Sequence, residues 1–242
     1  MNKMKKLKLF KTLLLIGPLT TSLPIVLSSC KSNTVDAAPD VSGIHWKGRT
    51  DGQFNENEYD IDLNAETITY KGSSEFCAHN LVIPDEVTYK GKQLKVLFAK
   101  GCFLNNFHLV NTITLNKYMD NIPQRCFENC TSLRKVIFTT YPKVVQKRAF
   151  MNCLLVKDFR VLINNREYQN WAIQLQRIED YAFSKCVIDM QHFILGQDLE
   201  YLGRYAFSSC YRIVELNMQL CTKLKAIGDG AFSNCFNITR VY

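Results

Sequence analysis

The chain contains ten cysteines and four histidines, the residue types best suited to nucleophilic, redox or metal-binding chemistry. None of the histidines lies in a zinc, nucleophile or acid–base motif. No glycine-rich phosphate loop of the GxGxxG or GxxxxGK[ST] type occurs. An acidic stretch at residues 51–62 lacks the central glycine of a calcium loop, which favours a solvated loop over a calcium site. We therefore expect no catalytic residue, no enzyme activity, no metal and no cofactor.

Cys30 is the cysteine to which the sequence gives a specific chemical role. Residues 1–11 are basic, residues 12–27 are mostly apolar, and residues 27–30 read Leu-Ser-Ser-Cys. This order is typical of a secretory signal, and the final tetrad resembles the lipobox of bacterial lipoproteins. The resemblance implies cleavage before Cys30, acyl chains on its sulfur, and anchoring at the extracellular face of the cell membrane. An ordinary signal peptide followed by a stray cysteine, or an uncleaved anchor, is the alternative.

The distribution of charge argues against a nucleic-acid partner. The formal net charge is +8, but five lysines fall within the first eleven residues. The chain after residue 29 has 25 basic and 22 acidic residues, which leaves only +3. A nucleic-acid-binding protein needs a concentrated basic face.

Most of the remaining cysteines belong to an internal repeat centred on phenylalanine. Six Phe residues follow Ala or Cys and are separated by steps of 24, 23, 33, 24 and 25 residues. An apolar residue lies five positions before each Phe, and a cysteine lies three positions after five of them, with Asn106 in the first unit. The six pairs are Cys102-Phe103, Cys126-Phe127, Ala149-Phe150, Ala182-Phe183, Ala206-Phe207 and Ala231-Phe232.

An alternation of apolar and polar residues follows each phenylalanine turn, as in Ile113 and Leu115 or Val136 and Phe138. This period predicts a half-buried strand in every unit. One unit of about 24 residues cannot bury its apolar face alone, so the units must stack. Six in-register strands would form one parallel sheet about 25 Å wide.

The repeat closely resembles the BspA-type leucine-rich repeats of bacterial surface proteins. Residues 178–186 (IEDYAFSKC) and 227–235 (IGDGAFSNC) carry the resemblance best, and it covers about residues 81–242. It implies a β-rich leucine-rich-repeat solenoid with a parallel sheet on one face and turns or short helices on the other. It also implies exposure at the cell surface and adhesion to proteins of host or neighbouring cells.

The domain organisation follows from these patterns. We predict a lipoprotein signal peptide at 1–29, a flexible tether at 30–43, an N-terminal β cap region at 44–80, and the repeat array at 81–242. Alternating residues at 59–63 and 66–70 predict a hairpin that caps the first unit. Residues 81–84 and 87–92 resemble the strand and hairpin that open such arrays. The 33-residue step holds about ten additional residues near 164–174, which predict a surface excursion, with a short helix as one option.

The repeat cysteines occupy positions that are fixed by the repeat, which indicates core packing. A free cysteine behaves as a small buried hydrophobe with a weak S–H donor, so we expect a column of thiols along the core. Disulfides remain an alternative, because stacked positions about 5 Å apart fall within bridging distance. However, five thiols in one column cannot all pair, and nine cysteines remain once Cys30 is acylated.

A binding face is expected on the outward strand positions, because solenoids bind macromolecules through such extended surfaces. The alternative is a solvated sheet face with no ligand. The insertion is a second candidate, since Tyr, Trp and Arg are enriched where binding energy concentrates. The candidate residues are Lys135, Asp158, Arg160, His192, Glu215, Asn217, Arg240 and Tyr242 on the strands, with Arg166, Tyr168 and Trp171 in the insertion.

The repeats reach the last residue without a polar capping segment. Solenoids normally need a terminal cap for solubility. Either the array continues beyond residue 242, or its final edge pairs with another molecule. The second possibility predicts self-association of a structural repeat module that has no ligand of its own.

The acylation of Cys30 can be tested by metabolic labelling. Radiolabelled palmitate should enter the wild-type protein expressed in a bacterial host, and the Cys30→Ala variant should remain unlabelled because it lacks the acceptor thiol. Labelling that survives the substitution contradicts the lipobox assignment.

Overall fold

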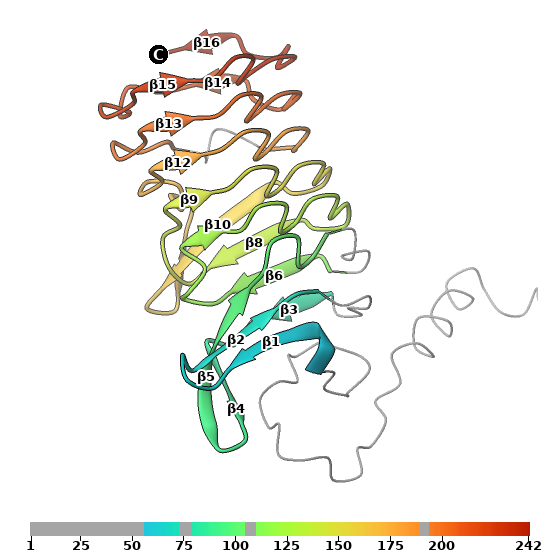
Figure 1. Ribbon diagram of the computed structural model, residues 1–242. Helices are drawn as coiled ribbons and strands as arrows, with labels where there is room; N and C mark the ends of the chain where they lie inside the picture. The colour runs from blue at the N-terminus through green and yellow to red at the C-terminus, as the bar shows by residue number, and fades with distance from the viewer. Residues whose placement is uncertain (1–55, 73–78, 105–109, 189–193) are drawn as a thin grey trace, which may run out of the picture.

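The phenylalanine of each unit stacks on that of the next to form a continuous column. The computed structural model describes residues 56–72, 79–104, 110–188 and 194–242. In it, consecutive ring centroids are 5.0–5.5 Å apart and their planes differ by 4–11°. The units follow one another along an elongated solenoid (Figure 1), whose buried core runs from Tyr59 to Cys235. The predicted leucine-rich-repeat solenoid is confirmed.

Two residues in the left-handed backbone region flank most of these phenylalanines. The position two before Phe has a φ of 54–67° in all six units, and the position two after Phe has a φ of 60–64° in the last five. A non-glycine residue in this region costs about 1–2 kcal/mol. Hydrogen bonds between units offset that cost. The Phe150 amide, for example, donates to the Ala182 carbonyl at 2.8 Å, and equivalent bonds join the other units.

One five-stranded sheet of the solenoid has strands of three to six residues and is called here the long-strand sheet. Strands β3 (Asn80–Val82), β6 (Thr112–Leu115), β8 (Lys135–Phe138) and β10 (Asp158–Ile163) pair in parallel. Strand β11 (Arg166–Tyr168) pairs antiparallel with β10 and closes that edge. In β6, the outward residues are half-buried and the inward Ile113 and Leu115 are fully buried, which is the predicted alternation.

A second parallel sheet, the short-strand sheet, contains the apolar residues five positions before Phe in the last five units. Each strand has two residues, and the sheet crosses the insertion without a break. The sequence indicated these positions as apolar but did not predict strands. The strands are β7 (Asn121–Ile122), β9 (Val144–Val145), β12 (Arg177–Ile178), β13 (Tyr201–Leu202) and β15 (Ala226–Ile227).

The prediction of one six-stranded parallel sheet is wrong. Beyond the insertion, β14 (Glu215–Leu216) and β16 (Arg240–Val241) form a separate parallel pair. The physical reason is that β11, which returns from the insertion, occupies the hydrogen-bonding edge of β10. The option of a short helix at 164–174 is also wrong, because β10 and β11 form a hairpin there.

Two hairpins cover the N-terminal end of the stack, as predicted. A 3₁₀ turn, η1 (Glu56–Glu58), precedes the first hairpin, β1 (Tyr59–Asp62) and β2 (Thr67–Tyr70), and the second comprises β4 (Glu86–Tyr89) and β5 (Lys92–Phe98). Strand β2 pairs in parallel with β5, which joins the hairpins into one sheet. The buried Tyr70 ring lies 5.4 Å from Phe103, so the cap extends the aromatic column by one ring.

The repeat cysteines form the expected column of free thiols. Within the described residues all eight cysteines are unpaired and buried. Five of them lie three positions after Phe, and each of these thiols donates to the carbonyl of the Phe in the preceding unit, at 3.0–3.3 Å. In the four later units of this set, the Phe carbonyl already accepts an amide from its own turn, so the thiol satisfies its second lone pair.

The aromatic column generates a stability prediction. Replacing the fully buried Phe183 by Ala should lower the free energy of unfolding by about 3–5 kcal/mol, because the cavity lies between two stacked rings. Replacing Phe236, which is 84% exposed, should change it by less than about 0.5 kcal/mol. Urea unfolding of residues 31–242 measures both, and equal losses would show that the column does not hold the units together.

Candidate functional site

Four charged side chains meet on the outer face of the long-strand sheet. The Lys135 ammonium lies 2.7 Å from the Glu167 carboxylate and 4.0 Å from Asp158, and Arg160 contacts Asp158 at 2.5 Å. The side chains are 25–39% exposed. The network pairs two cations with two anions, so the predicted face is nearly neutral. Glu167 was not among the predicted residues, because its place beside Lys135 depends on the β10–β11 hairpin.

Strand β11 adds two exposed side chains at the edge of this sheet. Arg166 is exposed, and Tyr168 is 43% exposed. The register pairs Val161 with Tyr168, Leu162 with Glu167 and Ile163 with Arg166. Because successive side chains of a strand alternate between faces, Glu167 shares the outer face with Lys135, Asp158 and Arg160, and these four residues are called here the β8–β11 face. Arg166 and Tyr168 lie on the other side of the same edge strand.

Trp171 does not belong to this surface, which corrects its prediction as a binding residue. It is 1% exposed and stacks on Phe159 at 4.8 Å and on Phe138 at 5.2 Å. The spacing in the sequence indicates the buried position of Trp171. Trp171 lies seven residues before the core residue Ile178, just as Phe138 lies seven before Val145. It therefore resumes the repeat after the insertion and fills the core.

The other predicted strand residues form a second group. Arg240 forms an ion pair with Glu215 across β14 and β16, and the Asn217 side chain accepts the Gln219 amide at 3.0 Å. Tyr242 is 49% exposed and bonds Leu216 and Met218 through its backbone. β11 prevents these strands from joining the long-strand sheet, so the predicted band is divided. His192 lies outside the described residues.

Sequence reasoning missed a run of tyrosines and arginines on the units that follow the insertion. Tyr181 and Tyr205 stack at 5.2 Å, and the Arg148 guanidinium lies 5.6 Å from the Tyr181 ring. Beside them, Arg177 lies 4.5 Å from the Tyr201 ring. For Arg177 and Tyr201 the missing signal was the short-strand sheet, whose register places them on neighbouring units. Arg148, Tyr181 and Tyr205 share the repeat position two before Phe, which stacks them in the turns.

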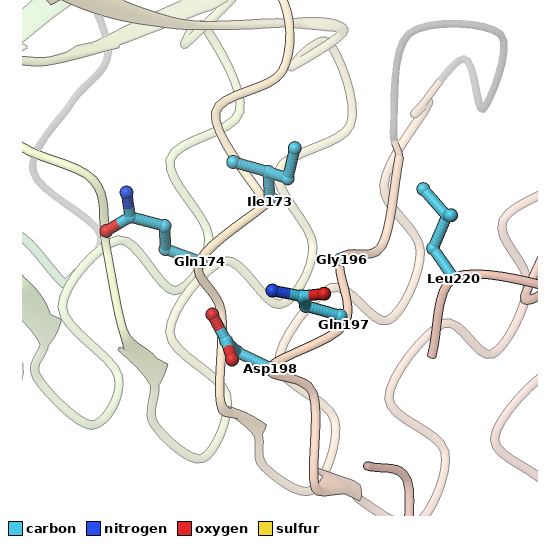
Figure 2. Close-up of a pocket in the computed structure, with 6 residues that line it drawn as sticks. All are labelled: Ile173, Gln174, Gly196, Gln197, Asp198 and Leu220. Carbon is cyan, nitrogen blue, oxygen red and sulfur yellow. The ribbon is translucent and has the colours of Figure 1, made fainter. Parts of the chain in front are cut away.

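An open depression of about 420 Å³ lies where the turns of the later units meet (Figure 2). Gln174, Gln197 and Asp198 line it, and Leu220 lies on the opposite side. Gly196 permits the close approach, because a Cβ there would lie 1.8 Å from the Ile173 carbonyl oxygen. Asp198 is already paired with Lys223 at 2.7 Å. The depression has a mixed polar and apolar lining, with no aromatic wall or second charged group among its lining residues.

The thiols of the core are poorly suited to nucleophilic chemistry. Burial raises the pKa of Cys210 to about 12 and raises the pKa of Cys126, Cys130 and Cys186 well above the usual value. These thiols are therefore protonated at neutral pH, which their role as donors to carbonyls requires. Across the described residues, no three His, Cys, Asp or Glu side chains are grouped so that they could hold a metal ion. In the same residues, no helix has the length and apolar character to cross a membrane.

The stacked units, the two parallel sheets and the polar outer face define a leucine-rich-repeat solenoid. A family model described as the BspA type leucine rich repeat region matches residues 77–175 and 168–242, in six copies. The match covers well over half of the sequence. The chain therefore belongs to the family of BspA-type leucine-rich-repeat proteins.

Two solved structures share this fold. A leucine-rich repeat protein from Bacteroides ovatus is 20% identical with a TM-score of 0.57, covering 76% of this chain and 44% of its own. A leucine rich cell surface protein from Faecalibacterium prausnitzii is 19% identical with a TM-score of 0.53, covering 78% and 53%. The chain thus spans about half the length of these two proteins. Among curated proteins, none matches the sequence.

Proposed function

We propose that this protein is a lipid-anchored cell-surface protein whose solenoid binds other proteins, in adhesion to host or neighbouring cells. The observation that carries the proposal is a rigid repeat scaffold that presents an ordered polar face, the β8–β11 face, on hydrogen-bonded strands. Membership of the BspA-type family supports it. The lipobox-like residues 27–30 and the description of the Faecalibacterium relative as a cell surface protein support the location.

The chemistry of the β8–β11 face favours a protein partner over a nucleic acid. Its charged network is balanced, with Lys135 and Arg160 matched by Asp158 and Glu167. Nucleic-acid binding needs a surplus of cations, whereas a balanced polar face suits a protein surface. An exposed tyrosine and arginine, Tyr168 and Arg166, lie on the other side of its edge strand. Because β8 and β10 are hydrogen-bonded to a strand on each side, little conformational entropy would be lost on binding. The protein acts in this proposal without catalysis.

The exposed pair on β11, Arg166 and Tyr168, tests whether the insertion at the edge of the sheet takes part in binding. The double variant Arg166→Ala, Tyr168→Ala should weaken binding to the cells or matrix proteins that bind wild type by at least about tenfold, because Tyr and Arg often dominate interface energy. Neither side chain fills the core, so the melting temperature should change little. Saturation binding of the purified mature protein measures the affinity.

The matched control removes a tyrosine and an arginine from another part of the surface. Tyr211, which is 53% exposed, and Arg212, which is also exposed, lie in the turn after Cys210. Their double Ala variant should bind as wild type does. Equal losses in the two variants would place the contact elsewhere, and the absence of saturable binding by the wild-type protein would remove support for the proposal.

Self-association is the second candidate function, and exposed core positions in the last unit favour it. Ile227 is 51% exposed and Val241 is 67% exposed, whereas their equivalents Leu202 and Leu216 are 0% and 5% exposed. A second molecule that packed on these residues would bury them as the earlier units bury theirs. In this alternative the module has no ligand of its own.

Sedimentation velocity over a range of concentrations tests self-association. Wild type should form dimers or larger species that Val241→Asp abolishes, because the charge would be buried in the contact. Val82→Asp is the control, since Val82 is 47% exposed on β3 at the other end of the array. A strictly monomeric protein at high concentration rules this candidate out.

A further inference from the structure

Two cysteines of the core differ from the others in what their thiols contact. Cys102 and Cys126 immediately precede the phenylalanines of the first two units, and their sulfur atoms lie 3.4 Å apart. Both residues are fully buried. The five cysteines three positions after Phe instead donate to main-chain carbonyls. The Cys102 and Cys126 thiols thus face each other in the positions before Phe.

The repeat shows that the slot before Phe does not itself require sulfur. The four later units place Ala149, Ala182, Ala206 and Ala231 in it, at 0–4% exposure. A methyl group therefore fills the slot. Two neighbouring units both carry a thiol there, and the Phe103 amide holds them in register by donating to the Cys126 carbonyl at 3.0 Å.

We propose that Cys102 and Cys126 are the site of a disulfide bond that joins the first two units of the exported protein. Cys102 and Cys126 occupy equivalent turns of adjacent units, and stacked residues at the spacing of paired strands lie about 5 Å apart between Cα atoms, within the range of bridged cysteines. The sulfur atoms need to approach by about 1.4 Å to reach the bond length of about 2.05 Å. We expect a change in side-chain torsion to supply that shift without moving the turns.

The bridge forms by thiol–disulfide exchange with a disulfide oxidant, either an exported oxidoreductase or glutathione disulfide. One cysteine thiolate attacks the oxidant, forms a mixed disulfide and releases one oxidant thiol. The second cysteine thiolate then attacks the cysteine sulfur of the mixed disulfide and releases the other oxidant thiol. The two cysteines lose two electrons and two protons in total, and the oxidant becomes two thiols.

The position of the bridge in the stack indicates which part of the solenoid it would stabilise. Terminal units of a solenoid have only one neighbour and open first. Gly72 of the cap packs directly on Cys102, since a Cβ at Gly72 would lie 2.8 Å from the Cys102 carbonyl oxygen. A link between Cys102 and Cys126 therefore fastens the cap and the first unit to the second. Burial of both thiols means that the link forms before the core closes, during folding after export.

Peptide mapping tests the proposal on the mature protein exported by a bacterial host, and on reduced protein refolded with glutathione disulfide. Each sample is denatured with an alkylating reagent present and then digested with trypsin. Residues 101–117 and 126–134 should appear as one linked species, 2 Da lighter than the two peptides, that separates on reduction. Complete alkylation of Cys102 and Cys126 in both samples overturns the proposal.

Two variants distinguish Cys126 from Cys130, which shares its tryptic peptide. Cys126→Ala should abolish the link and still fold, because Ala fills this slot in four units. Cys130→Ala should retain it. Reduction should lower the melting temperature of wild type by about 5–10 °C and leave that of Cys126→Ala unchanged. A link that persists in Cys126→Ala assigns the bridge to Cys130 and overturns the proposal.

Discussion

The fold depends on one match of distances, that between hydrogen-bonded strands and stacked aromatic rings. Parallel strands lie about 4.8 Å apart, and the phenylalanine rings of this protein follow at 5.0–5.5 Å. The amide of each Phe donates to the small residue that precedes the next Phe, so the backbone spacing imposes the ring spacing. Ala or Cys is needed beside each ring because a larger side chain would separate the units.

This constraint decides where the chain tolerates an insertion. Phe150 and Phe183 are 33 residues apart in sequence, yet their rings stack at 5.4 Å as closely as the others. The additional residues leave the stack after Val161 and return at Trp171, which restores the core. The column and the short-strand sheet continue, while the long-strand sheet ends at β11. An insertion at the sheet edge thus leaves the core intact and creates the exposed Arg166 and Tyr168.

The sequence predicts the structural features that recur in every unit. It does not predict the features of units that depart from the repeat. The phenylalanine pairs, the thiol column and both hairpins were predictable, because each has a period or a turn signal within a few residues. The two-residue strands such as Arg177–Ile178 were not, since one inward residue gives no alternation. Trp171 was predicted to be a surface residue because it falls within the residues assigned to the insertion, 164–174. Counting backward from Ile178 places it in the core.

The same comparison between units separates structural residues from those free to serve function. A residue that returns at one position in every unit is explained by packing, as the cysteines after Phe are by the carbonyls they satisfy. A residue that departs from the repeat needs a different reason. Arg166 and Tyr168 lie in an insertion that only one unit has, and Cys102 and Cys126 replace the alanine of four other units. In a protein built from repeats, the residues for binding and cross-linking are therefore expected at positions that depart from the repeat.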